Sequence, residues 1–145
     1  MSYMINQLSE AVKAGNLHEV SFLLSRKHSV NAQDKFGVTA LQLAAMNGFE
    51  DILIQLLENG AKLNDCDTDG FTALHLAASN GHIECVNLLI NYKAAVNVKD
   101  RSGATPSHYA KQNGHDDILN VLHCKRTRKE ILTDVNQMEQ SCISP

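Results

Sequence analysis

Apolar residues recur at helical spacing in short segments along most of the chain. Leu41, Ala44 and Ala45 lie at positions i, i+3 and i+4, which predicts one buried face of a short helix that ends at Gly48. A second short helix is predicted to follow, with leucines on its buried face within residues 53–57. Each predicted helix is shorter than about 12 residues and should not be stable alone in water, so neighbouring helices must bury these faces.

The same pattern returns every 33 residues. Glycine, threonine, aspartate, asparagine and alanine positions all hold this period. They are Gly37, Gly70 and Gly103; Thr39, Thr72 and Thr105; Asp34, Asp67 and Asp100; Asn31, Asn64 and Asn97; Gly15, Gly48, Gly81 and Gly114; and Ala11, Ala44, Ala77 and Ala110. A fixed period of this length indicates an array of structural repeats whose stacking builds the core.

Turn and cap residues predict where each helix begins and ends. The repeated threonines stand where a hydroxyl can cap a helix start, and Pro106 suits the first helical position of its unit. The glycines that share the register of Gly48 end the first helix, because glycine adopts left-handed backbone angles at little cost. Lys27 and Lys93 occupy the place that Gly60 holds after a second helix, so those two helix ends are expected to be less favourable.

The third unit carries the clearest family signature. Residues 70–78 read Gly-Phe-Thr-Ala-Leu-His-Leu-Ala-Ala, Gly-His follows at 81–82, and the unit closes with Ala-Ala-Val-Asn at 94–97. Together with the Thr-Pro pair at 105–106, these motifs make the chain resemble the ankyrin-repeat proteins over about residues 4–125. The resemblance implies an all-α dominated repeat solenoid, an ankyrin-type stack of helix-turn-helix units joined by β-hairpin fingers.

The repeats predict one ankyrin-repeat domain over residues 1–125. Its units are expected at about 4–34, 35–67, 68–100 and 101–125. Met4 stands where the first unit would have its finger glycine and Glu10 replaces a leucine, so this unit is expected to lack a finger and to cap the stack. In the last unit Ser107, Lys111 and His123 replace apolar residues, which predicts a terminal repeat with a hydrated outer face.

Residues 126–145 form a C-terminal tail outside the repeats. Thr127 and Glu130 match a capping box, and apolar residues follow at helical spacing over 131–138. The pattern predicts a helix to about residue 140. Two roles are open for it: it packs over the last repeat as a lid, or it offers an amphipathic face to a partner.

Composition narrows the class of protein. The chain has 145 residues, of which 43% are hydrophobic and 20% charged, enough for one domain core and too apolar for a disordered chain. Its net charge of −3 contrasts with the basic balance of proteins that coat nucleic acid. No segment has the length of a membrane span, and the four cysteines show no paired metal or redox spacing. These features predict reduced thiols and a cytoplasmic location.

One segment resembles a metal-binding loop in its sequence. Residues 65–70 read Asp-Cys-Asp-Thr-Asp-Gly, like the start of a calcium loop, but Leu76 stands where a bidentate glutamate is needed. An acidic finger tip is the favoured interpretation. Cys85, in a predicted second helix, is expected to fill space instead of reacting.

Histidines recur once per repeat instead of gathering in one place. The pairs are His75 with His108 and His82 with His115. The resemblance to ankyrin repeats assigns them to hydrogen bonds between helices and hairpins, which disfavours zinc. The sequence contains no phosphate-binding glycine loop, zinc-protease motif or nucleophile elbow. The chain is therefore predicted not to be an enzyme and to use no cofactor, metal or small-molecule substrate.

Residues 125–129 (Lys-Arg-Thr-Arg-Lys) form the one dense basic run. The favoured interpretation is a solvated helix end, where cations interact favourably with the helix dipole. The alternative is a nuclear-import signal or a nucleic-acid contact, which would make the chain a nuclear or chromatin-associated regulatory cofactor. No aromatic residues are interleaved with the run, so nucleic acid is the disfavoured partner.

Finger tips and the exposed edges of first helices commonly carry partner contacts in ankyrin-repeat proteins. The resemblance therefore implies a protein interaction module or adaptor, monomeric alone, that holds another protein in a concave groove. The matching positions are Lys35, Phe36, Val38, Met46, Asn47, Thr68, Asp69, Phe71, Ser79, Asn80, Arg101 and Gln112. Phe36, Val38, Met46 and Phe71 occupy registers that do not demand large apolar groups, so an exposed hydrophobic patch is predicted there. The alternative is that Phe36 and Phe71 only pack finger on finger.

The repeated asparagines have two interpretations. Proteins of this family are often substrates of an asparaginyl hydroxylase, and the matching positions here are Asn31, Asn64 and Asn97. The alternative is that these side chains only hydrogen-bond the backbone of the hairpins.

Overall fold

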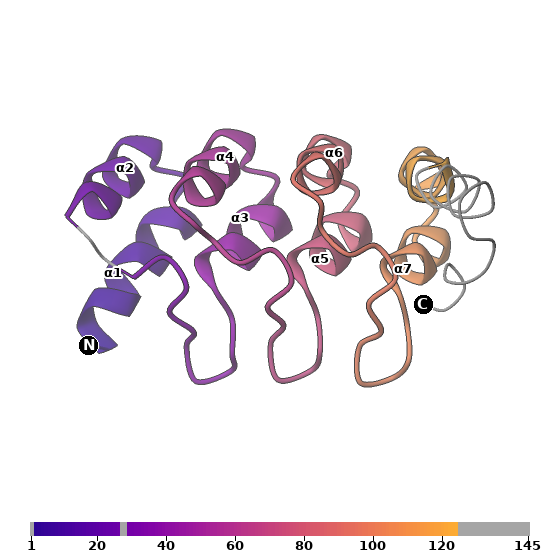
Figure 1. Ribbon diagram of the computed structural model, residues 1–145, viewed down its shortest axis with the longest axis horizontal. Helices are drawn as coiled ribbons and strands as arrows, with labels where there is room; N and C mark the ends of the chain where they lie inside the picture. Colours follow the sequence, from indigo (N-terminus) through magenta and orange to yellow (C-terminus); the bar gives the residue numbers. More distant parts are fainter. Residues whose placement is uncertain (1, 27–28, 125–145) are drawn as a thin grey trace, which may run out of the picture.

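The computed structural model describes residues 2–26 and 29–124, with side chains from residue 7 onward. Its helices are α1 (Ser2–Lys13), α2 (Leu17–Ser25), α3 (Ala40–Asn47), α4 (Glu50–Glu58), α5 (Ala73–Ser79), α6 (Ile83–Asn91) and α7 (Pro106–Gln112), with a further helical segment over residues 116–124. Figure 1 shows two layers: α1, α3, α5 and α7 form an inner row, and α2, α4, α6 and residues 116–124 form an outer row. The predicted helical repeat stack is confirmed.

The first helices begin where the repeated threonines predict. In α3 and α5, Thr39 and Thr72 accept hydrogen bonds from backbone N–H groups three residues on, both at 3.3 Å. Thr105 caps α7 in the same way at 3.4 Å, and Pro106 occupies the first helical turn, where its missing N–H costs nothing.

Left-handed residues end the helices as predicted. Gly48 caps α3 with φ +74°, and the other glycines of that register share this backbone conformation. Lys93 follows α6 with φ +78°, and within the described chain it is the one residue other than glycine in this region. An L-residue is strained there, which confirms the expectation for Lys93. Lys27 lies outside the described residues.

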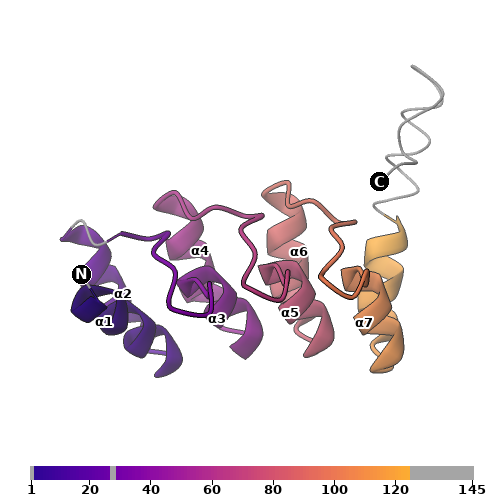
Figure 2. The same cartoon turned by 90° about the horizontal axis from the view of Figure 1, so that it is seen from below.

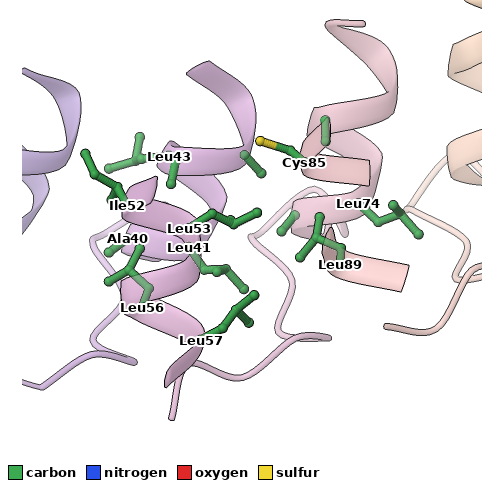
Figure 3. Packing of buried hydrophobic residues seen from close by; sticks show 14 of the residues in the cluster. Ala40, Leu41, Leu43, Ile52, Leu53, Leu56, Leu57, Leu74, Cys85 and Leu89 are labelled. Atoms are coloured by element: carbon green, nitrogen blue, oxygen red, sulfur yellow. The ribbon is translucent and has the colours of Figure 1, made fainter. Parts of the chain in front are cut away.

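The core lies between the two layers and runs through all units. Leucines in one register of the outer row are nearly or fully buried, and alanines in one register of the inner row let neighbouring helices approach closely. They are Leu23, Leu56, Leu89 and Leu122 in the outer row, and Ala11, Ala44, Ala77 and Ala110 in the inner row. Figure 3 shows the close packing of this cluster around α3 to α6. Each unit thus completes its core with side chains of the next.

Polar side chains mark both ends of the described stack. Helix α1 continues from Ser2 through the position of Met4, so a helix stands where later units have a finger, and Glu10 is exposed. In the last unit Lys111 and His123 are exposed and Ser107 is half-buried. The predicted hydrated face of the terminal repeat is confirmed.

The fingers correct one expectation. They were predicted as β-hairpins, but in residues 2–26 and 29–124 no β-strand forms, and each finger is a turn closed by its own aspartate. In the first finger Asp34 N–H donates to Val38 O at 3.0 Å, and Gly37 N–H donates to Asp34 O at 2.9 Å. The Asp34 carboxylate takes two further N–H groups of the finger, so few backbone groups remain for a strand ladder.

The predicted tail helix and the basic run at 125–129 lie outside the described residues. Within the described part, no helix combines the length and the apolar character needed to cross a membrane.

Candidate protein-binding face

One aspartate shapes each finger tip. Oδ1 of Asp67 accepts the backbone N–H groups of Asp69 and Phe71 at 2.9 and 3.0 Å, and Asp34 and Asp100 make the equivalent pair of bonds in their fingers. The carboxylate that resembles a calcium ligand in the sequence therefore organises its own turn. Across residues 2–26 and 29–124, no group of three or more His, Cys, Asp or Glu residues could hold a metal ion.

Neighbouring fingers are joined through their backbones. Thr68 N–H donates to Phe36 O at 2.9 Å, and one repeat later Arg101 N–H donates to Asp69 O at 3.0 Å. Nη1 of Arg101 also donates to Thr68 O at 3.2 Å, so its guanidinium lies against the second finger. Figure 2 views the stack from the side on which the fingers lie. These bonds make the row of fingers one continuous surface.

Buried polar side chains tie the inner helices α3 and α5 to the next finger. Nδ1 of His75 accepts from Thr72 N–H at 3.1 Å, and Nε2 donates to Ala104 O at 3.0 Å, which requires a neutral ring. Gln42, one repeat earlier, makes equivalent hydrogen bonds with its side-chain amide: the oxygen accepts from the N-cap of its own helix, and the nitrogen donates to carbonyls of the second finger. Burial lowers the pKa of His75, and the carbonyl of Ala104 and the carboxylate of Asp100 only partly oppose this effect.

The short turns between helices are joined in a second ladder. Nε2 of His82 donates to Met46 O at 3.0 Å, and Nε2 of His115 donates to Ser79 O at 3.1 Å. The predicted hydrogen-bonding role is thus confirmed for His82, His115 and His75. It is wrong for His108, which is exposed: in the described chain no hydrogen bond reaches its ring, because no finger follows the fourth unit there.

Aromatic rings gather where the second finger meets the inner helices. The ring of Phe71 lies edge-on to His75 at 5.8 Å and to Tyr109 at 5.6 Å, measured between ring centroids. Leu76 holds on α5 the same repeat register that Tyr109 holds on α7, the neighbouring inner helix, and both side chains are half-buried. Sequence reasoning missed Leu76 and Tyr109 as surface residues. The signal was the period itself, which places Leu43, Leu76 and Tyr109 in one register.

The third finger carries an additional bond. Tyr109 donates its hydroxyl proton to Oδ2 of Asp100 at 2.5 Å, while the backbone N–H groups of Ser102 and Ala104 donate to Oδ1. Burial alone would raise the pKa of Asp100, but these hydrogen bonds outweigh it and hold that pKa well below its ordinary range. The same bond raises the pKa of Tyr109.

A family model described as ankyrin repeats, three copies, matches residues 8–100 and 53–134, which is most of the chain. The chain belongs to the ankyrin-repeat family. A stretch of 57 residues is also 46% identical to the mitochondrial disaggregases of Bos taurus and Homo sapiens. That stretch is 39% of this chain and 8% of each disaggregase, so the chain spans only a small part of the length of these relatives. The resemblance stated from the sequence is confirmed at the level of the family.

The ankyrin stack exposes most of the predicted contact positions. Exposed side chains are Lys35, Phe36, Asn47, Thr68, Asp69, Asn80, Arg101 and Gln112. Val38, Met46, Phe71 and Ser79 are half-buried. The predicted hydrophobic patch is therefore wrong in its extent: Val38 and Met46 pack against the core and Phe71 packs on two rings, so of these four side chains Phe36 alone is mostly exposed.

The asparagines of the ankyrin units bridge to the next repeat. Oδ1 of Asn31 accepts from Lys62 N–H at 2.8 Å and its Nδ2 donates to Gly60 O at 3.1 Å, while Oδ1 of Asn64 accepts from Ala95 N–H at 3.0 Å. These bonds reach the loop after the next outer helix, not the hairpin of the same unit. Hydroxylation of Asn64 or Asn97 stays a prediction.

Cys85 serves packing in the ankyrin core. Its thiol is fully buried in the register that holds Ile52 and Ile118 in the adjoining units. Burial, with a smaller contribution from the carboxylates of Glu50 and Glu84, raises the pKa of this thiol to about 11. The thiolate needed for reaction is therefore disfavoured, in agreement with the space-filling role expected from the sequence.

Proposed function

We propose that this chain is a non-catalytic adaptor that holds a segment of another protein against its inner face, meaning the finger tips and the exposed edges of α3, α5 and α7. Ankyrin repeats generally mediate protein–protein interaction. What we propose beyond this general role is which face of the chain binds and that the partner is a segment of another protein. The continuous backbone bonding from finger to finger supports it, because a rigid surface loses little entropy when a partner binds.

The observation that carries the proposal is the exposure of Phe36. Its side chain is 59% exposed at the tip of the first finger, and the ammonium of Lys35 lies 5.3 Å from the centroid of its ring. The same register holds Asp69 and Ser102 in the other fingers, so repeat stacking does not require an aromatic residue there. Exposed aromatic side chains are frequent anchors of protein interfaces.

The test compares two exposed phenylalanines. Phe22 on α2 is 50% exposed on the outer row and also has a cation, Arg26, over its ring at 5.6 Å. Phe36→Asp and Phe22→Asp thus make the same chemical change on the inner face and on the outer row. We expect affinity capture from native cell lysate to yield a partner with the wild type and with Phe22→Asp, and to lose it with Phe36→Asp. Circular dichroism checks that both variants stay helical.

Two outcomes contradict the proposal. Capture that persists with Phe36→Asp would remove the inner face as the binding surface. Loss with Phe22→Asp alone would move the interface to the outer row.

A second candidate, a nuclear or chromatin-associated cofactor, follows from the basic run at 125–129. Its test is the salt dependence of binding to duplex DNA, because contacts to phosphates weaken steeply as salt rises. The same run would let a cytoplasmic adaptor enter the nucleus, which imaging of a tagged chain with neutralised lysines and arginines would check.

A further inference from the structure

Three apolar side chains on the inner face have no place in the core. Phe71, Leu76 and Tyr109 are half-buried, and none of them belongs to the core cluster or packs directly against it. They come from the second finger, α5 and α7, and the Phe71 and Tyr109 rings touch edge-on at 5.6 Å. We call these three residues the inner strip.

The polar group of the strip is already satisfied. The Tyr109 hydroxyl donates to Asp100, so what this residue offers to a partner is the exposed part of its ring. The ring of Phe71 contacts the rings of His75 and Tyr109, and its backbone N–H donates a hydrogen bond to Asp67. The strip is therefore a preformed apolar surface, and its side chains would lose little conformational entropy when a partner binds.

Charge beside the Tyr109 end of the strip is positive. Lys99 and Arg101 are exposed on the third finger, whereas the carboxylate of Asp100 between them is 7% exposed and saturated by hydrogen bonds. Nη1 of Arg101 is anchored on Thr68 O, which leaves other N–H donors of an oriented guanidinium free for a carboxylate. The third finger thus presents exposed positive charge that can pair with an anionic side chain.

We propose that the inner strip binds an apolar–acidic peptide segment. Large aliphatic or aromatic side chains of the segment lie on Phe71, Leu76 and Tyr109, and a neighbouring aspartate or glutamate of the segment pairs with Lys99 and Arg101. This inference rests on the proposed function, because it names the partner chemistry for the same inner face. Its main competitor is a basic segment drawn to Asp69 on the second finger, and the two differ in the sign of the peptide charge.

The test uses a random dodecapeptide library displayed on phage and the full chain as bait. We expect enriched peptides to hold at least two large apolar residues with Asp or Glu close to them in the sequence. An enriched peptide is then synthesised with a fluorescent label and titrated by anisotropy. Arg101→Glu should weaken its binding about tenfold or more, because an attractive charge pair becomes repulsive.

Lys62→Glu is the matched control for charge. It makes the same reversal at an exposed lysine in the loop after α4 and should leave the affinity unchanged. Leu76→Ala, which shortens a half-exposed side chain, should weaken binding about tenfold, since an apolar anchor is removed. A peptide in which the acidic residue is replaced by Lys should bind Arg101→Glu better than wild type.

Each other outcome overturns the inference in whole or in part. Enrichment of basic peptides, or of none, removes the apolar–acidic partner. Peptides that lose affinity with Leu76→Ala but not with Arg101→Glu keep the inner face as a binding surface and refute only the charge assignment. If both variants bind the peptides as tightly as the wild type does, the inner strip is not the binding site. The capture experiment with Phe36→Asp then tests the proposed function separately.

Discussion

Tyr109 on α7 donates its hydroxyl proton to Asp100 in the third finger, and the two oxygens lie 2.5 Å apart. The earlier units hold Leu43 and Leu76 in the register of Tyr109, so the first two fingers have no such bond. Each of those two fingers is hydrogen-bonded through its backbone to the finger that follows it, whereas in the described chain no finger follows the third. The bond thus holds the last finger to the inner helix of its own unit.

Tyr109→Phe is expected to lower the free energy of unfolding by about 1–3 kcal/mol, because a buried carboxylate loses a donor. Urea unfolding at pH 7 followed by circular dichroism measures the change. Tyr92→Phe is the control: this hydroxyl lies at the exposed end of α6, and its removal should change stability by less than about 0.5 kcal/mol. Equal effects of the two variants would show that the Asp100 bond contributes nothing.

His75→Gln is expected to keep the fold and to reduce the pH dependence of stability. Gln42 already makes the equivalent bonds one repeat earlier, so stability at pH 7 should change by less than about 1 kcal/mol. The pKa of His75 is lowered in the folded state, so the unfolded chain takes up this proton first, and stability declines as pH falls below about 6.5. The glutamine variant should lose that part of the decline.

Thermal unfolding at pH 7 and pH 5 measures the effect. His108→Gln is the control, because its ring is exposed in the same register of the last unit and should leave the pH dependence unchanged. If the wild type and His75→Gln lose equal stability between these pH values, the buried neutral ring is not the cause.

Gly48→Ala and Gly114→Ala separate backbone strain from contact between repeats. Both glycines have nearly the same φ, +74° and +76°, so both variants carry a penalty of about 1–2 kcal/mol. A Cβ on Gly48 would lie 2.6 Å from Nδ1 of His82, whereas a Cβ on Gly114 would meet no atom of the described residues within 4 Å. We expect Gly48→Ala to cost at least about 1 kcal/mol more in urea unfolding. Similar costs would mean that the His82 ring moves aside freely.

Lys93→Gly is expected to stabilise the chain by about 0.5–1 kcal/mol, since glycine removes the left-handed strain at φ +78° at some cost in backbone entropy. The reverse exchange, Gly60→Lys, should destabilise by a similar amount, because a Cβ there meets no atom of the described residues within 4 Å and only the backbone is strained. Melting temperatures of the two single variants check the pair. A shift of the same sign in both would contradict the explanation.

Much of the fold follows from the period of 33 residues. The threonine caps, the left-handed glycines and the apolar registers all lie where the repeat places them, because they depend on contacts within a unit or on contacts that every unit repeats. The polar substitutions Ser107 and Lys111 also revealed the hydrated end of the stack. Residues that share a register share an environment only in the middle of such an array, and for that reason the prediction for His108 was wrong.

The sequence by itself therefore determined the helical repeat stack, the caps of its first helices and the family. Only the tertiary structure decided which side chains of the inner face are free. The period shows that Phe36 and Phe71 belong to neighbouring fingers, but not that the Tyr109 ring, 38 positions beyond Phe71, packs against it, nor that Asp100 takes the Tyr109 proton. These contacts join residues of different registers, the first between adjacent units and the second within one unit. They depend on how far each side chain reaches in space, which no spacing along the chain records.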